Sequence, residues 1–185
     1  MLQRLIRAIR VGLGLMAVVA LVSGCGFRLQ GTTPLPFDTL LITIPENTEF
    51  GADVRRAIRA ASPQTTIVND PSIPHQAKLQ EVQESRSARE VSLNPQGRVE
   101  EFELTLRYTF RLVTANDEII LPATTLTAVR DLPFDDRVVQ AKEIEEATLF
   151  RQMQKSLVPR LLRRISAIDV SQNYAKIQKS ANNGR

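Results

Sequence analysis

The sequence predicts an α+β two-layer sandwich, in which two helices pack on one face of a single antiparallel sheet of four strands. Three patterns support this fold. Residues 102–112 alternate between apolar and polar side chains, as in a strand with one packed and one solvated face. Apolar residues recur at helical spacing over 49–61 and again over 141–168. A mixed sheet is the alternative that the pattern leaves open.

The N-terminal segment has the pattern of an export signal. Arg4, Arg7 and Arg10 precede any acidic residue, and an apolar stretch over 11–22 follows them. A basic region and a short apolar core are typical of a cleaved signal peptide, and this core is shorter than the ~20 residues that span a bilayer. We therefore expect residues 1–24 to be removed.

Cys25 is the only cysteine of the chain, and it follows the small residues Ser23 and Gly24. The string Val-Ser-Gly-Cys resembles a bacterial lipobox, which implies covalent lipid on Cys25. The alternative is an ordinary signal peptide with a chance cysteine beside the cleavage site. Gly26 stands where an Asp would favour retention in the inner membrane, so we expect an outer-membrane anchor. Residues 25–38 are then a lipidated tether.

The net charge gives no reason to expect nucleic-acid binding. The full chain has 24 Lys and Arg against 20 Asp and Glu, and residues 1–24 contain three of the basic residues and none of the acidic ones. The mature chain therefore has a charge of about +1. Its 161 remaining residues suffice for one domain, which we place at 39–168.

The first half of this domain contains a strand over 39–44 that Pro45 ends, then a helix over 49–61. Residues 65–68 form a short strand or an extended segment, and 69–74 form a turn. In the helix the apolar positions are Val54, Ala57, Ile58 and Ala61, with Arg55, Arg56 and Arg59 on other faces.

Residues 77–93 do not alternate cleanly. We expect a long, irregular or bulged strand, with a helix over 78–90 as the competing interpretation. The string Asn94-Pro95-Gln96-Gly97 then predicts a turn.

The clearest periodicity follows this turn and predicts a hairpin of strands 99–113 and 118–130. Pro122 implies an edge position or a bulge in the second strand. The packed face of the first strand carries Phe102, Leu104, Leu106, Tyr108, Phe110 and Leu112, and its solvated face carries Glu101, Glu103, Thr105, Arg107, Thr109 and Arg111.

A long helix over 141–168 closes the predicted domain. Pro159 removes one amide donor from it, so we expect a kink near 155–159 or a break there. Residues 169–185 are polar and aperiodic, which favours a disordered tail. The apolar stripe of the helix contains Ile144, Ala147, Phe150 or Met153, Leu157, Leu161, Ile165 and Ile168.

The residues do not form a catalytic pattern. His75 is the only histidine and lies in a predicted turn, and the sequence has no HExxH pair, phosphate loop or nucleophile elbow. Glu143, Glu145 and Glu146 are expected at the start of the long helix, where acids interact favourably with its dipole. We therefore expect a protein that is not an enzyme and that binds no metal and no cofactor, apart from the covalent lipid on Cys25.

Basic residues gather on the long helix. A solvated helix face explains them, and a contact with anionic lipid or a partner is the alternative. The residues are Arg151, Lys155, Arg160, Arg163 and Arg164.

Four short segments carry a family resemblance. They are Cys25-Gly-Phe-Arg-Leu, the turn 94–98 leading into Glu101-Phe-Glu-Leu-Thr, the string Ala141-Lys-x-x-Glu-Glu, and Met153 followed by Leu-Leu-Arg-Arg-Ile at 161–165. Their order and spacing resemble the LptE family of lipopolysaccharide-assembly lipoproteins.

The resemblance implies a non-catalytic outer-membrane lipoprotein that faces the periplasm. It implies that the domain plugs the lumen of a large outer-membrane β-barrel (LptD-like), helps this barrel to assemble, and binds lipopolysaccharide during delivery to the cell surface. Lys142 matches the family lysine of the Ala-Lys segment and is the implied lipopolysaccharide-binding residue. Pro95 stands where some relatives have a basic residue, and Arg98 is the substitute that we assign.

A polar solvated strand face agrees with a plug, because barrel lumens are polar, but it also suits any soluble domain. The alternative function is a lipoprotein that scaffolds another envelope complex without a role in lipopolysaccharide transport. A lipid-anchored hydrolase is disfavoured by the lack of a catalytic constellation.

Overall fold

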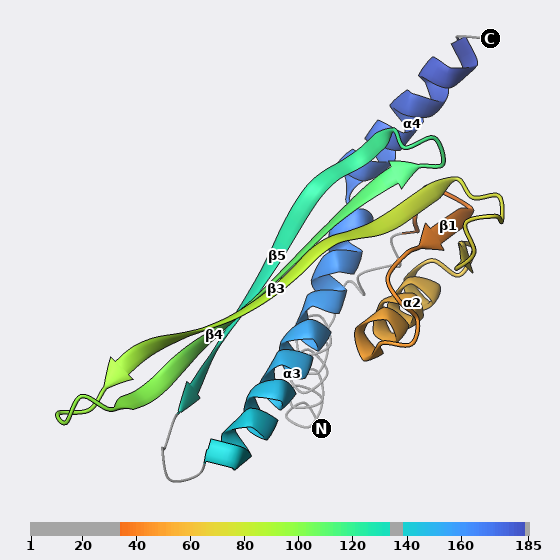
Figure 1. Ribbon diagram of the computed structural model, residues 1–185. Helices are drawn as coiled ribbons and strands as arrows, with labels where there is room; N and C mark the ends of the chain where they lie inside the picture. The colour runs from red at the N-terminus through yellow and green to blue at the C-terminus, as the bar shows by residue number, and fades with distance from the viewer. Residues whose placement is uncertain (1–33, 134–138, 184–185) are drawn as a thin grey trace, which may run out of the picture. The chain divides into compact units, whose positions relative to one another are not determined.

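The computed structural model describes residues 34–133 and 139–183 (Figure 1). The predicted signal peptide and Cys25 lie outside the described residues. The elements in chain order are β1 (Thr39–Ile42), α2 (Glu49–Ala61), β2 (Thr66–Val68), β3 (Ala77–Leu93), β4 (Val99–Thr114), β5 (Ile119–Pro133), α3 (Val139–Ile165) and α4 (Ile168–Asn183).

The fold is α+β, as predicted, and the sheet is mixed, the alternative that the sequence left open. It has five strands in the order β2-β1-β3-β4-β5. β1 pairs in parallel with both β2 and β3, whereas β3, β4 and β5 are antiparallel. The prediction of four strands and two helices therefore missed one strand and one helix. Parallel pairing arises because α2 carries the chain from β1 back to the start of β2.

α2 has the bounds that its periodicity predicts. The Thr48 hydroxyl caps its first turn by accepting a hydrogen bond from the Gly51 amide at 3.0 Å. Phe50, Val54 and Ile58 form the buried stripe of the helix. Arg55, expected on a face other than the apolar one, is 4% exposed and is the main departure from the predicted pattern.

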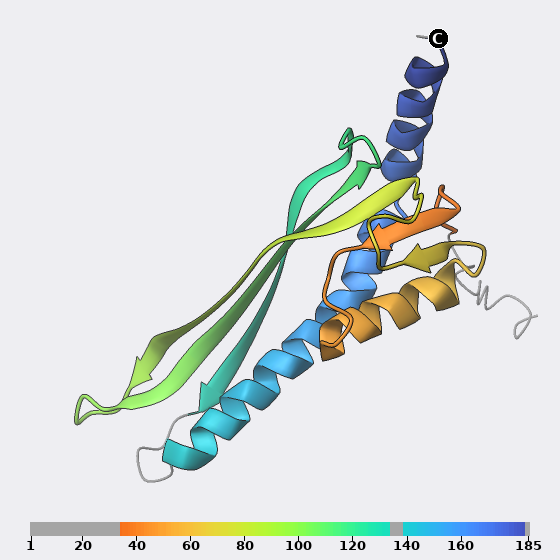
Figure 2. The ribbon, with the colours of Figure 1, turned by 45° about the vertical axis from the view of Figure 1, so that its right-hand side comes forward.

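β4 supplies the centre of the core, and its predicted alternation is confirmed. Leu104, Leu106, Tyr108 and Phe110 are each at most 1% exposed. α2 and α3 cover this face, since the Phe50 ring of α2 lies 4.7 Å from the Tyr108 ring and α3 packs on β4 and β5 (Figure 2).

β3 is a bulged strand, as expected, and its irregular sequence has a structural cause. Directly paired residues of antiparallel strands share a face, so Glu84 lies on the same face as its partner Tyr108. This charged side chain is held by Gln154 of α3, whose Nε2 donates to the Glu84 carboxylate at 2.7 Å. Arg86 lies over the Phe150 ring at 5.4 Å. Polar side chains thus occupy the helix-facing side of β3, which hides the alternation.

Pro122 lies on β5, which is an edge strand, and a register shift stands nearby between Phe110 and Leu112 of β4. Both positions that the sequence offered for this proline, edge and bulge, are therefore realised. Proline has no amide proton to donate. It is tolerated there because an edge strand pairs with a neighbour on one side only.

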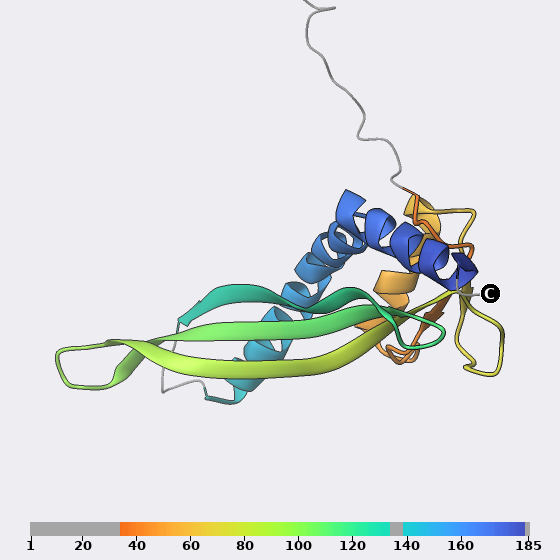
Figure 3. The same ribbon diagram turned by 90° about the horizontal axis from the view of Figure 1, so that it is seen from above.

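α3 continues through Pro159 to Ile165, so of the two expected alternatives, a kink near 155–159 or a break, the break is absent. The chain changes direction at 166–167, between α3 and α4 (Figure 3). Ion pairing of Arg164 with Asp169, with both Nη atoms within 3.0 Å of the carboxylate, joins the two helices across this turn.

The C-terminal segment is helix α4, so the expectation of a disordered tail at 169–185 was wrong for its described part. Val170 is fully buried, and the Tyr174 ring meets the Phe37 ring edge-on at 5.8 Å. A pattern of only two large buried residues in a polar background is too weak to be recognised in the sequence.

The segment assigned to the tether is also partly folded. Leu35 is 5% and Phe37 1% exposed, and the Leu35 amide donates to the Ser62 hydroxyl at 3.0 Å. Residues 35 and 37 of the expected tether therefore pack with the domain. Among the described residues, no helix has the length and apolar character needed to cross a membrane.

Candidate functional site

The two candidate lipopolysaccharide-binding residues lie at one end of the sheet, which we call the hairpin end. It comprises the β3–β4 turn 94–98, the last residues of β5 and the first turns of α3 (Figure 2). Pro133 pairs with Glu101, three residues from Arg98, and Lys142 contacts Pro133. The fold therefore brings both predicted residues to the same end of the molecule.

Lys142 is held by its own domain. Its Nζ donates to the Pro133 carbonyl oxygen and to Glu145 Oε2, the second contact at 3.1 Å. Its side chain is only 15% exposed. These contacts join the first turns of α3 to the end of β5, so an anionic ligand would have to compete with them.

Arg98 closes the tight turn of the hairpin. The Asn94 amide donates to the Arg98 carbonyl at 2.8 Å, and the Asn94 side chain accepts from the Arg98 amide at 2.9 Å. Gly97 has a φ of +76°, a conformation that favours glycine. The Arg98 residue is exposed and stands at the tip of the sheet.

Most of the basic residues on α3 are used within the fold. Lys155 pairs with Glu49 of α2 at 2.6 Å, and Arg160 donates to the Thr127 carbonyl of β5 at 2.6 Å. The Lys155 ammonium holds the pKa of Glu49 below its ordinary value of 4.5. The expected solvated face is thus a set of contacts between neighbouring elements.

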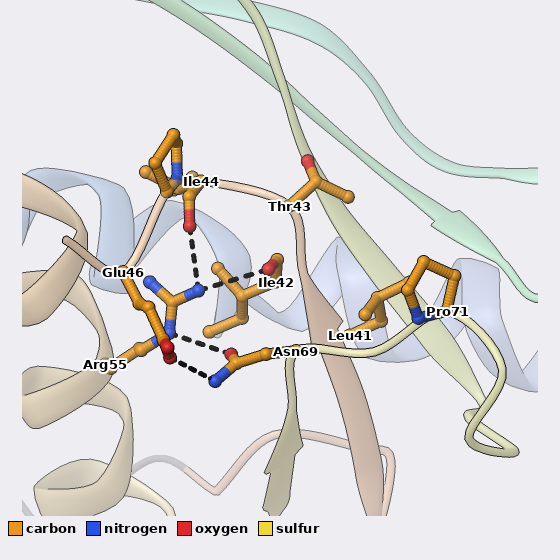
Figure 4. Close-up of a pocket in the computed structure, with 9 residues that line it drawn as sticks. Leu41, Ile42, Thr43, Ile44, Glu46, Arg55, Asn69 and Pro71 are labelled. Carbon is orange, nitrogen blue, oxygen red and sulfur yellow. Dashed lines mark hydrogen bonds between the residues drawn. The ribbon is translucent and has the colours of Figure 1, made fainter. Parts of the chain in front are cut away.

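The sequence did not reveal the most buried cation of the domain, Arg55. It lines a pocket of about 370 Å³ at the carboxyl ends of β1 and β2 (Figure 4). Its Nη2 donates to the carbonyls of Ile44 at 2.7 Å and Ile42 at 3.2 Å, and its Nε donates to Asn69 Oδ1 at 3.0 Å. Asn69 in turn donates to Glu46. Burial lowers the pKa of Arg55, and the Glu46 carboxylate opposes this shift.

Main-chain carbonyls and one amide thus satisfy the Arg55 guanidinium, which fixes the turn after β1. No signal in the helix periodicity separates this arginine from Arg56 and Arg59 beside it. The difference is visible only in three dimensions, where Arg55 is buried against main-chain carbonyls and Arg56 is exposed and pairs with Asp53.

The described residues contain no group of three or more His, Cys, Asp or Glu side chains arranged to hold a metal ion. His75 Nδ1 lies 2.9 Å from the Ile73 carbonyl oxygen, and its buried Nε2 has no partner among the described residues. The buried Tyr108 hydroxyl donates to Glu81 at 3.1 Å, and burial raises the pKa of Tyr108 well above its ordinary value. The geometry of these groups does not assemble a nucleophile with a base.

Comparison with known proteins agrees with the sequence resemblance. The family model described as LptE, lipopolysaccharide-assembly, matches residues 37–165. The LPS-assembly lipoprotein LptE of Photorhabdus laumondii subsp. laumondii is 27% identical over 170 residues, which cover 88% of this chain and 87% of the relative. The protein of the same name from Yersinia enterocolitica is 26% identical over 182 residues, 96% of this chain and 83% of the relative.

Solved structures share the fold. Lipoprotein B from Nitrosomonas europaea is 36% identical, with a TM-score of 0.61 over 77% of this chain and 91% of that chain. The rare lipoprotein B from Shewanella oneidensis, at 24% identity, has a TM-score of 0.58 over 72% and 98% of the two chains. Because the family model spans the strands β1–β5 and all of α2 and α3, the chain belongs to the LptE family of lipopolysaccharide-assembly lipoproteins.

Proposed function

We propose that the chain is a non-catalytic, lipid-anchored component of the outer membrane that plugs a large β-barrel translocon and binds lipopolysaccharide on its way to the cell surface. The observation that carries this proposal is the family match over residues 37–165. The anchor is covalent lipid on Cys25, which holds the domain on the periplasmic side of the membrane.

The surface of the domain supports insertion into a polar lumen. The outer face of β4, opposite the helices, carries only polar and charged side chains over 101–111. Barrel lumens are polar and water-filled, so a plug with this face loses little solvation on entry. The partner is an LptD-like lipopolysaccharide-assembly barrel.

The hairpin end is the proposed lipopolysaccharide site. Arg98 and Lys142 are cations, and the glycolipid carries phosphate groups that guanidinium and ammonium groups bind. Arg98 is exposed, and Lys142 must exchange its bond to Glu145 for one to the ligand.

Purification from native outer membranes tests the partner. Tagged full-length chain, extracted in mild detergent, is expected to bring down a large β-barrel protein and lipopolysaccharide in stable amounts. Recovery of the processed chain as a monomer, free of both, would overturn the proposal. A Cys25→Ala variant is the control for the anchor, since it should reach the membrane less efficiently.

Charge reversal tests the site. We expect R98E and K142E together to weaken equilibrium binding of lipopolysaccharide, while K176E and K179E together on the exposed side of α4, with the same change of charge, leave it unchanged. Unchanged binding by the double variant would remove the hairpin end as the site.

A second candidate function follows from the hydrogen bonds of Lys142 to Pro133 and Glu145 within the fold. If this lysine is purely structural, the domain scaffolds an envelope complex without touching lipopolysaccharide. Co-purification with envelope proteins other than a β-barrel, without lipopolysaccharide, would favour that function.

A further inference from the structure

The centre of the outer sheet face carries two arginines and no carboxylate. We call this set the outer-face centre and define it by register, since directly paired residues of neighbouring strands share a face. Its members are Gln80, Gln83, Ser85 and Ser87 of β3, Thr105, Arg107, Thr109 and Arg111 of β4, and Thr125, Thr127 and Val129 of β5.

Arg107 stands in the middle of this set. Ser85 of β3 and Thr127 of β5 flank it directly. The residue is exposed, and no hydrogen bond or ion pair joins its guanidinium to any other residue in the described part of the chain. The Arg107 guanidinium thus has five N–H donors without a protein acceptor in the described part of the chain, and hydroxyl side chains surround it.

Arg111 lies four residues further along β4 on the same face. Its Nε donates to Gln80 Oε1 at 2.7 Å, a neutral partner that leaves the positive charge without a contacting anion. Four residues of strand separate two Cα atoms by roughly 13 Å.

The cations at the margins of the face differ, because each has an acidic partner. Arg89 pairs with Glu103 at 3.0 Å towards the hairpin end, and Lys78 pairs with Asp117 at 2.9 Å at the opposite end. The excess positive charge of this face therefore lies at its centre.

We propose that the outer-face centre binds the phosphorylated saccharide head group of lipopolysaccharide, with Arg107 and Arg111 each contacting an anionic group. This inference rests on the proposed function and adds a second contact surface to it, away from the hairpin end. Guanidinium groups bind phosphate through paired hydrogen bonds, and the intervening Ser and Thr hydroxyls match the hydroxyl groups of a sugar that joins two phosphates.

The composition of this face favours a polar glycolipid head over a protein wall. Protein interfaces are anchored by buried aromatic and apolar side chains. The aromatic residues of β4 point to the opposite face, where Tyr108 and Phe110 are buried in the core. Val129, at 43% exposure, is the only large apolar member and lies at the margin.

The test is equilibrium binding of the purified lipoprotein to lipopolysaccharide and to the same lipopolysaccharide after removal of its phosphates. We compare the wild-type chain with R107Q/R111Q and with R89Q. R89Q is the matched control, because Arg89 is 72% exposed on the same face but already paired. Thermal unfolding of each variant checks that the fold is kept.

We expect R107Q/R111Q to bind intact lipopolysaccharide about tenfold more weakly than wild type, as loss of charge-assisted hydrogen bonds predicts. R89Q should bind as wild type, and the difference should vanish with the dephosphorylated ligand. The difference should also shrink as salt rises.

Two results would overturn the inference while leaving the proposed function intact. One is wild-type affinity in R107Q/R111Q; if that variant also fails to co-purify with a β-barrel, the face is a contact with the barrel wall. The other is equal loss in R89Q, which would indicate a general charge effect. If the wild-type chain itself does not bind lipopolysaccharide, both this inference and the proposed binding role fail.

Discussion

The Arg55 Nη2 atom lies 2.7 Å from the Ile44 carbonyl oxygen, so a buried cation of α2 holds the turn that follows β1. The same guanidinium reaches Gly51 within its own helix at 3.0 Å. Gly51 itself packs tightly on this turn, since a Cβ there would lie 2.0 Å from the Pro45 carbonyl oxygen. One side chain therefore links the parallel part of the sheet to the helix that covers it.

Replacing this arginine with lysine is expected to destabilise the domain. Arg55→Lys keeps the charge but cannot reach the carbonyls of Ile42 and Ile44 and the Asn69 amide together, so buried acceptors lose their donors. We expect the free energy of unfolding to fall by about 2–4 kcal/mol in chemical denaturation. Arg56→Lys is the control, since Arg56 is exposed. Equal stability of the two variants would contradict the assigned role.

Pro159 is expected to destabilise α3. The residue is exposed within a helix that continues on both sides of it. Pro159→Ala restores one amide donor and removes the clash with the preceding turn, so the free energy of unfolding should rise by about 1–3 kcal/mol. Denaturant unfolding measures this change. A less stable variant would mean that the proline sets a bend on which the packing of α3 depends.

α4 is expected to contribute to the stability of the domain. Tyr174→Ala removes a ring that is 8% exposed and leaves a cavity beside Phe37. We expect a loss of about 2–4 kcal/mol, with reduced hydrogen-exchange protection of α4. Lys179→Ala, on the exposed face of the same helix, should change neither. Unaltered stability in Tyr174→Ala would restore the interpretation of this segment as a loose tail.

Acid should weaken the domain through its paired carboxylates. The Lys155 ammonium holds the pKa of Glu49 below 4.5, and Lys78 and Arg164 likewise lower the pKa values of Asp117 and Asp169. A carboxyl with a lower pKa in the folded chain stabilises it above its unfolded pKa, and this contribution is lost as pH falls through the folded value.

We therefore expect stability to decline as pH drops below about 4.5. The stability of Glu49→Gln should decline less than that of wild type, because a glutamine side chain does not titrate. The difference should be small, since exposed ion pairs contribute modestly to stability. Unfolding curves between pH 7 and 3 measure the difference. Parallel pH profiles for both chains would show that the Glu49–Lys155 pair does not contribute.

The sequence predicted the elements in which one periodicity dominates. α2 has its predicted bounds because Phe50, Val54 and Ile58 pack on a single face. β4 was recognisable because every second residue enters the core. β3 was less clear because the Glu84 and Arg86 side chains occupy its inner face, and their partners Gln154 and Phe150 are more than 60 residues away.

Long-range pairing also explains the missed topology. β1 and β2 are short, and nothing in their composition shows that β1 inserts between β2 and β3 in parallel. The roles of Arg55 and Lys142 were hidden for the same reason. Each is satisfied by main-chain carbonyls, which every residue has and which no motif marks.

The sequence singled out two residues for the candidate site, and their binding of lipopolysaccharide stays a prediction. The family resemblance brought Lys142 and Arg98 to attention, and the fold places both at the hairpin end. The uncompensated charge of Arg107 depends on which neighbours lack carboxylates across three strands, a property that appears only once the register is known.

Depletion of the chain in its native host, followed by quantification of lipopolysaccharide at the cell surface, shows whether the chain acts in lipopolysaccharide assembly. We predict that surface lipopolysaccharide falls as the chain is lost, while newly made lipopolysaccharide accumulates inside the cell envelope, and that the wild-type chain restores delivery. Normal surface lipopolysaccharide in cells that lack detectable chain would contradict a role in its assembly.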